Sequence, residues 1–402
     1  MTSQSAKPKE DFEALFARTT ASFFFREFCF SRTEFTPPGG SEIELADFAL
    51  QLRDIFMVFQ LKERANATTD PQRERSWFES KILKKASKQV RDTVTYLRDH
   101  GPEIANDRGR AVAFPRDATG DGTHKIVVFR PSEHLPEDCR NYRFHDSKTT
   151  GLIHILASAD WNGIITTLIT PREIADYLAF RTAVCRRHPE LARATSERAL
   201  VGQFLDGSHD LPPSAVFTER LNQLADDEES FDLRKFLNLF GDRLTEALPA
   251  GALVPRDLQS ANSDYYDIFA ELALFTRSDL KLFKERLMIA WRDAGQEETE
   301  GPAVMRFVAS TGTGFVILPI PPNMTSHMIN GLANFVMAHM YDQKIRRCVG
   351  AAIDRDGQHR NVVWLLRDHE WKHDPACEEW LKSSPLPSVR SREYERYTFI
   401  VS

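Results

Sequence analysis

Two short stretches, Glu44-Leu45-Ala46-Asp47 and Ile55-Phe56-Met57-Val58-Phe59-Gln60-Leu61-Lys62, decide the fold expected for this chain. Both are predicted to be strands, and because side chains alternate along a strand, Gln60 and Lys62 share one face. The same alternation puts Glu44 and Asp47 on opposite faces, which makes Asp47 the better partner for that face. An acid on one strand, with an acceptor and a lysine on the next, can converge on one hard cation and one phosphate.

The segments around these strands predict the order helix, three strands, helix. Phe12, Leu15 and Phe16 recur at helical spacing, and Pro37-Pro38-Gly39-Gly40 has the composition of a turn. Gly101-Pro102 ends the second helix. The predicted elements are a helix over 11–20, an extended segment over 23–35, strands over 43–50 and 55–62, and a helix over 76–100.

The second of these helices is basic along one side. Leu83, Ala86, Val90, Val94 and Leu97 form its apolar face, and the cations predicted to share the other face are Lys81, Lys84, Lys85, Lys88 and Arg91. Such a row suits contacts with phosphates, which give affinity but no reading of base sequence. A solvated basic face is the alternative. Gln89 lies at the border of this face.

This layout resembles the PD-(D/E)XK superfamily of restriction-endonuclease-like nucleases, in the branch that carries Gln-x-Lys. The resemblance covers roughly residues 10–115. It implies that Asp47 binds the metal, that Gln60 replaces the second acid and that Lys62 is the catalytic lysine. Glu13 on the first helix matches a glutamate that many members place beside the metals. The implied cofactor is Mg²⁺ or Mn²⁺, held by oxygen ligands.

The resemblance implies a metal-dependent endonuclease that hydrolyses phosphodiester bonds of DNA, with RNA left open as a substrate. A role in prokaryotic antiviral defence is also implied. Glutamine is neutral, so this site holds less negative charge than a pair of carboxylates and is expected to bind metal more weakly. A degenerate nuclease fold that binds nucleic acid without cutting it is therefore the alternative.

The rest of the chain predicts a mixed α+β protein in three parts. Strands are expected over 110–114, 125–129, 152–157 and 164–169, with Asn162-Gly163 as a hairpin turn between the last two. A capped helix begins at Pro171. The expected parts are a nuclease-like domain with a central mixed sheet over 1–185, a helical connector over 186–262 and a C-terminal α/β domain over 263–402. The last is expected to regulate, to bind a protein partner or to form a homo-oligomer.

A second metal motif competes with the first. His369-Glu370-Trp371-Lys372-His373 fits the H-E-x-x-H signature of zinc peptidases, in which two histidines one helical turn apart bind the metal. The signature needs a helix through both histidines. Pro375 disfavours helical geometry just beyond them, and 362–366 reads as a strand. The zinc metallopeptidase is thus the weaker alternative.

Composition sets the broad class. The chain has 402 residues, a net charge of −6 and 42% hydrophobic residues, which is typical of a globular protein with more than one domain. No run approaches the ~18 apolar residues that would indicate a membrane span. The N-terminus lacks the apolar core of a signal peptide, and the five cysteines are scattered without CxxC spacing. A cytoplasmic protein without membrane contact is expected.

Overall fold

The computed structural model describes residues 11–23, 26–66, 68–106, 109–120, 122–225, 263–296, 304–322, 324, 327–356 and 359–383. They form two compact units, one ending with helix α9 (Phe217–Ala225) and one beginning with helix α11 (Ser263–Ala273). Each unit combines helices with a mixed sheet, so the predicted mixed α+β class is confirmed. Within the described residues, none of the helices has the length and apolarity needed to cross a membrane.

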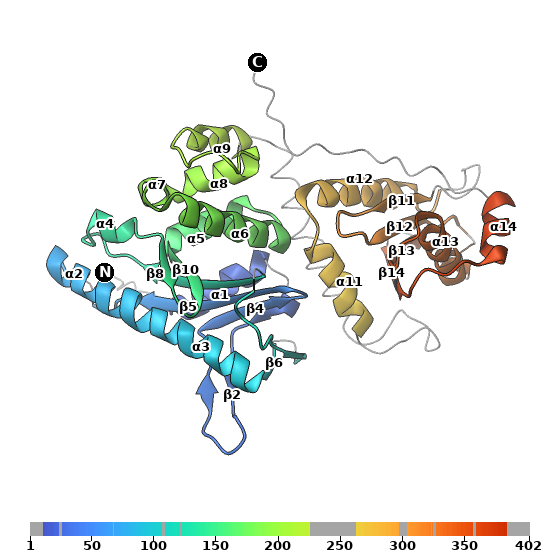
Figure 1. Cartoon of the computed structure of the whole chain (residues 1–402). Helices are drawn as coiled ribbons and strands as arrows, with labels where there is room; N and C mark the ends of the chain where they lie inside the picture. Colours follow the sequence, from blue (N-terminus) through green and yellow to red (C-terminus); the bar gives the residue numbers. More distant parts are fainter. Residues whose placement is uncertain are drawn as a thin grey trace, which may run out of the picture. The chain divides into compact units, whose positions relative to one another are not determined.

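A six-stranded sheet organises the first unit (Figure 1). Its order is β1 (Cys29–Phe30), β4 (Phe48–Leu52), β5 (Ile55–Glu63), β8 (Thr123–Arg130), β10 (Gly151–Ala157) and β9 (Phe144–Ser147). Strand β5 pairs antiparallel with β4 and parallel with β8, and β8 pairs parallel with β10. Two small ribbons, β2 (Glu34–Phe35) with β3 (Ile43–Glu44) and β6 (Glu103–Ala105) with β7 (Ala111–Ala113), complete the strands of this unit.

Helices cover both faces of this sheet, and strand alternation decides which residue meets which layer. Phe59 of β5 packs against Phe16 of α1 (Phe12–Phe23) and Trp161 of α5 (Ser158–Thr167), with ring centroids 5.3 and 5.1 Å apart. Its neighbour Val58 points to the other face, into a cluster with Val94 of α3 (Ser87–His100). Burial on both sides explains why β5 reads as a nearly continuous apolar run.

The long basic helix begins five residues earlier than the predicted start at 76. It runs through α2 (Pro71–Trp77), the π-helical segment η2 (Phe78–Ala86) and α3. Asp70 caps it by accepting hydrogen bonds from the backbone N–H groups of Gln72 and Arg73, and Pro71 occupies the first turn. Aspartate followed by proline is a helix-start signal, so these two residues set the boundary.

The strand predicted over 164–169, with its Asn162-Gly163 turn, is wrong. These residues belong to α5, which begins directly after β10. Trp161, Ile164, Ile165 and Leu168 are all buried, and their i, i+3, i+4, i+7 spacing is that of a helix face. Helical periodicity therefore prevails over the local turn signal of Asn-Gly.

The helices after residue 170 pack onto the same unit. They are α6 (Pro171–Arg187), α7 (Pro189–Ala194), α8 (Glu197–Asp206) and α9, with the short helices η1 (Arg26–Phe28) and α4 (Glu137–Arg140) elsewhere in the unit. Arg181 of α6 is fully buried and donates to both carboxylate oxygens of Glu197 on α8, at 2.8 and 3.0 Å. Residues 186–225 are thus a layer of the first unit, where a connector was predicted; 226–262 lie outside the described residues.

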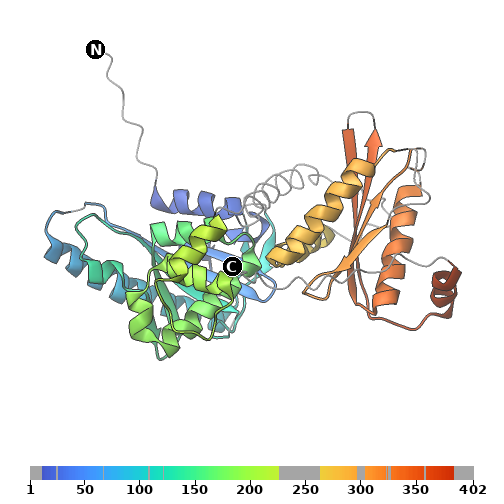
Figure 2. The same ribbon diagram turned by 90° about the horizontal axis from the view of Figure 1, so that it is seen from above.

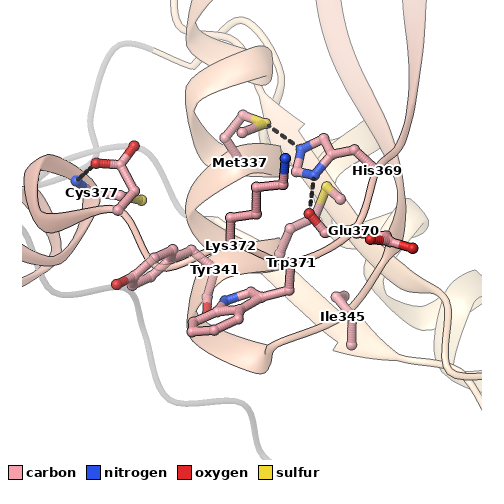
Figure 3. A pocket seen from close by; sticks show the side chains of 10 residues that line it. Met337, Tyr341, Ile345, His369, Glu370, Trp371, Lys372 and Cys377 are labelled. Atoms are coloured by element: carbon pink, nitrogen blue, oxygen red, sulfur yellow. Dashed lines mark hydrogen bonds between the residues drawn. The ribbon is translucent and has the colours of Figure 1, made fainter.

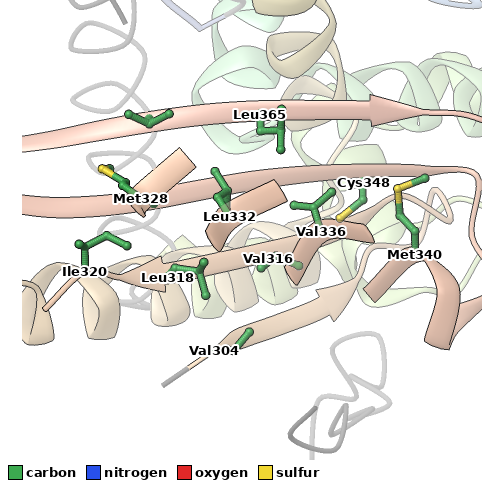
Figure 4. Close-up of a cluster of buried hydrophobic side chains, with 12 residues drawn as sticks. Val304, Val316, Leu318, Ile320, Met328, Leu332, Val336, Met340, Cys348 and Leu365 are labelled. Atoms are coloured by element: carbon green, nitrogen blue, oxygen red, sulfur yellow. The ribbon is translucent and has the colours of Figure 1, made fainter. Parts of the chain in front are cut away.

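The second unit is a four-stranded sheet with helices on both faces. The strands are β11 (Met305–Val308), β12 (Gly314–Pro319), β13 (Arg347–Asp356) and β14 (His359–Asp368), and only β12 and β13 are parallel. Helices α11 and α12 (Arg277–Asp293) lie on one side and α13 (Met328–Gln343) on the other (Figure 2). Val316 and Leu318 pack under α13 (Figure 4). Phe315 packs against Phe275 and Phe283.

Two glycines in helices of the first unit provide a matched test of how closely those helices pack against their neighbours. A Cβ at Gly202 of α8 would meet the backbone oxygen of Phe217 at 2.0 Å, whereas a Cβ at Gly163 of α5 meets nothing within 4 Å. We expect Gly202→Ala to lower the free energy of unfolding by about 1–3 kcal/mol through overpacking. Gly163→Ala should raise it by about 0.5–1 kcal/mol because alanine favours a helix. Denaturant unfolding of both variants measures this, and destabilisation by Gly163→Ala would contradict α5.

The buried ion pair gives a second test. Glu197→Gln leaves Arg181 with no counter-charge at either oxygen, and breaking a buried pair in this way costs about 3–5 kcal/mol. Glu190→Gln is the control, because the Glu190–Arg193 pair on α7 is exposed and should contribute less than about 1 kcal/mol. Thermal unfolding of the full chain compares the two. Equal melting temperatures would show that α8 is not bound to α6 through this pair.

Candidate functional site

The strand predicted over 43–50 is interrupted at Leu45–Asp47, between β3 and β4. The hydroxyl of Thr33 accepts a hydrogen bond from the Ala46 N–H at 2.9 Å and donates to the Ala46 carbonyl. The Thr93 hydroxyl, on α3, donates to the Leu45 carbonyl. These side chains take up backbone groups that would otherwise pair in a ladder, so Asp47 lies just before β4 and not at a strand's centre.

Asp47, Gln60 and Lys62 come together as predicted from strand alternation. The Nζ of Lys62 lies 3.0 Å from Oδ2 of Asp47 and 3.4 Å from Oε1 of Gln60. The same Asp47 oxygen accepts a hydrogen bond from the backbone N–H of Leu61. The Gln60 side chain is only 2% exposed and that of Lys62 is 15% exposed. The three groups therefore form one cluster in which the lysine reaches solvent.

Two further carboxylates lie within electrostatic range of this cluster. Burial and then the charge of Asp47 raise the pKa of Glu13, and the same two causes, in the same order, raise the pKa of Glu44. Lys62 lowers both pKa values but does not outweigh the acids. Glu44 thus acts on the same side as Asp47, contrary to the opposite faces predicted for a continuous strand. The break at Leu45–Asp47 is the physical reason.

A pocket of about 160 Å³ opens beside these groups. It is lined by Ile43, Glu44, Leu45, Ala46, Asp47, Gln60, Gln89, Asp92, Thr93 and Tyr96. The amide oxygen of Gln89 is buried and has no hydrogen-bond partner among the described residues. A buried acceptor without a donor costs free energy, so this oxygen is poised to receive a donor or a cation that enters the pocket. Thr93 and Tyr96 are site residues that sequence reasoning missed, because only the packing of α3 brings them here.

All five basic residues predicted for the long helix are exposed: Lys81, Lys84, Lys85, Lys88 and Arg91. Lys88 is paired with Asp92 at 2.7 Å, which reduces its charge toward a ligand. Hydrogen bonds in a π-helix run from i to i+5, so η2 winds more slowly than the α-helix assumed from sequence. Gln89 lines the pocket, and the lining does not include any of the five basic residues.

The site contains oxygen atoms of the kind that bind a metal ion, but its carboxylates do not lie close enough together to form a metal centre. Within the described ranges, no three His, Cys, Asp or Glu side chains lie close enough together to hold an ion. The residues with side-chain carboxylate or amide oxygens that line the pocket are Glu44, Asp47, Gln60, Gln89 and Asp92, the last paired with Lys88. This hard-oxygen set suits Mg²⁺, which keeps several waters and needs few protein ligands. Glu13 is exposed and does not line this pocket.

The competing histidine motif has the irregular backbone that Pro375 predicts. Residues 369–374 follow β14 without forming a helix, and α14 (Pro375–Ser383) begins only after them. His369 contacts the Met337 sulfur at 3.3 Å, while His373 contacts the Glu378 carboxylate at 3.1 Å. The two histidines therefore have separate partners, and the geometry that zinc peptidases need is absent from this segment.

Comparisons with protein-family models, with curated proteins and with solved structures found no match for this chain.

The clustered acids make a prediction about pH. Burial, then the charge of Asp47 and then that of Glu34, which lies opposite Glu44 in the β2–β3 ribbon, disfavour the ionised form of Glu44 in the folded chain and raise its pKa. A raised folded pKa means that stability is lost as the pH rises through that pKa. In EDTA, Glu44→Gln should raise the melting temperature at pH 7 by about 1–2 °C. The gain should vanish near pH 4, around the ordinary glutamate pKa of about 4.3.

The exposed acid Glu133, remote in sequence from this cluster, provides the control. Glu133→Gln should shift the melting temperature equally little at both pH values. A pH-independent gain in Glu44→Gln would show that charge repulsion at this site is not its cause.

Proposed function

We propose that this chain is a metal-dependent endonuclease that hydrolyses phosphodiester bonds of DNA. The observation that carries the proposal is the convergence of Asp47, Gln60 and Lys62 from two paired strands beside a pocket. The order α1, β1, β4, β5, long helix and then β8, parallel to β5, supports it, since the sequence resemblance implies helix, three strands, helix for such nucleases. Antiviral defence is the setting that the resemblance implies.

Asp47 and the amide oxygen of Gln60 would hold Mg²⁺ or Mn²⁺, with Glu44 and Glu13 adding negative charge. Two features of the site suit a cation: the raised pKa values of Glu44 and Glu13, and the unpaired Gln89 oxygen. A positive charge would relieve the repulsion among the acids. When bound, such an ion lowers the pKa of a ligand water and offsets negative charge on the phosphate.

Lys62 is placed to act on the reacting phosphate. Its ammonium group is held by Asp47 and by the Leu61 carbonyl, at 3.0 and 2.8 Å, which fixes the position of the charge. A fixed cation that does not need to reorganise stabilises developing negative charge in a transition state. Its three donors also allow it to orient a nucleophilic water. Lys81 and Lys85, which are exposed on the same long helix as Gln89, would contact phosphates farther along the strand.

The alternative is a nucleic-acid-binding protein that does not cut. One observation favours it: Oδ2 of Asp47 is already taken by Lys62 and by the Leu61 N–H, and Gln60 brings no charge to replace it. In that case the basic helix would bind DNA while Asp47 and Lys62 serve only as a structural ion pair.

Plasmid DNA cleavage separates these functions. The wild type with Mg²⁺ should nick or linearise plasmid, and Asp47→Ala or Lys62→Ala should slow cleavage about 100-fold or more. His373→Ala is the matched control, because it removes a candidate ligand of the competing motif and should leave the rate unchanged. Cleavage by both Asp47→Ala and Lys62→Ala at the wild-type rate would refute the proposal, and so would activity that persists in EDTA.

Binding experiments distinguish the non-catalytic alternative. If the wild type shifts DNA in a gel but does not cut DNA or RNA with either metal, the binding function stands and the nuclease proposal fails. Lys85→Gln should then weaken binding by a similar factor for every DNA sequence and lower the slope of log affinity against log salt by about one.

A further inference from the structure

The second unit contains its own pocket, of about 470 Å³, between the end of α13 and the segment that follows β14 (Figure 3). It is lined by Met337, Met340, Tyr341, Ile345, His369, Glu370, Trp371, Lys372, Asp374 and Cys377. Its size falls within the range of about 300–1,000 Å³ that is usual for small-molecule sites. Four of the five residues of the H-E-x-x-H segment thus line a cavity, although the segment does not form the zinc site that its sequence resembles.

One wall of this pocket is aromatic and held in place. The indole N–H of Trp371 donates to the carbonyl of Tyr341 at 3.1 Å, and the two rings lie 5.6 Å apart. That carbonyl belongs to the last turn of α13 and also accepts the backbone N–H of Lys344, so the indole joins the cap of the helix. Trp371 nevertheless remains 36% exposed. A fixed and accessible ring pair of this kind is a surface on which a planar ligand can stack.

Lys344 strengthens this wall. It ends α13 with a positive φ of 53°, a conformation uncommon for a residue other than glycine. Its ammonium lies 5.7 Å from the centre of the Trp371 ring. The helix end therefore places a positive charge over the Trp371 ring, at the cost of a strained backbone.

Some polar groups that line the pocket already have hydrogen-bond partners within the protein, and others are available to a ligand. The carboxylate of Asp374 already accepts from the backbone N–H of Ala376 at 2.9 Å, at the start of α14. Lys372 and Glu370 line the same cavity, and neither side chain forms an ion pair with another described residue. The available groups are thus one ammonium and one carboxylate beside an aromatic wall and a floor of methionines.

We propose that this pocket binds a mononucleotide whose base carries an exocyclic amino group. The base would stack on Trp371 and Tyr341, the phosphate would meet Lys372, and Glu370 would accept a hydrogen bond from the amino group. The Lys372 ammonium is then paired with a negatively charged phosphate, and the Glu370 carboxylate is paired with a hydrogen-bond donor. An aliphatic peptide would fill the floor but would leave Lys372 and Glu370 desolvated and unpaired, which is costly. The site is separate from Asp47 and does not depend on the proposed nuclease activity.

Titration calorimetry on the full chain tests this assignment. The Asp47→Ala background with EDTA prevents cleavage and metal-mediated binding at the first unit. AMP should bind saturably, UMP more weakly because it lacks the amino group, and adenosine more weakly because it lacks the phosphate. Trp371→Ala should weaken AMP binding about tenfold or more, since stacking contributes about 1–3 kcal/mol per base. Trp371→Phe, which keeps a stacking ring, should retain most of the affinity.

Lys372→Gln should weaken AMP binding while leaving adenosine binding unchanged. Lys382→Gln is the control, since Lys382 is an exposed lysine of α14 that pairs with Glu378 outside the pocket lining. Failure of AMP to bind would overturn the proposal. It would also be overturned by AMP binding that survives Trp371→Ala, or by equal losses of AMP and adenosine affinity in Lys372→Gln. A circular-dichroism spectrum and melting curve of each variant confirm that it is folded.

Discussion

The burial of β5 on both faces is the constraint on which the first unit depends. Because β5 pairs with β4 on one edge and β8 on the other, its register is fixed from both sides. The apolar residues then point alternately toward α1 with α5 and toward α3, which leaves Gln60 and Lys62 together where the apolar run ends. A slip of one residue would move both to the opposite face and would separate them from Asp47. The candidate chemistry and the core are therefore determined by the same register.

Buried charge defines the extent of this unit. On folding, Arg181 and Glu197 lose their contacts with water and form an ion pair with each other. Tyr177 donates a further hydrogen bond to the Glu197 carboxylate. Neither charge is tolerable alone in a low-dielectric interior. Helix α8 consequently cannot be treated as a tether between domains, although the sequence of 186–225, with its short helices and polar loops, looks like one. The pair joins residues 16 positions apart across two helices.

Much of the candidate site could be predicted because its key residues lie on one regular strand. Gln60 and Lys62 needed only the period of a strand, and the exposed lysines of the long helix needed only a helical one. Three features could not be predicted in this way: the break at Leu45–Asp47, the slower winding of η2 and the unpaired oxygen of Gln89. Each arises from contacts between distant segments, as with Thr93 and Leu45, which are 48 positions apart.

Hydrophobic periodicity is a local property of the chain, so it was enough to predict the mixed α+β class, the strand that carries Gln60 and Lys62, and most helices. The sequence also indicated that Pro375 keeps His369 and His373 off a common helix. Only the tertiary structure decided that Glu44 joins Asp47, that α8 belongs to the first unit and that Trp371 lines a pocket. Those outcomes depend on which side chains form hydrogen bonds with distant backbone groups and which pair with buried charges. Local periodicity does not predict such long-range pairings.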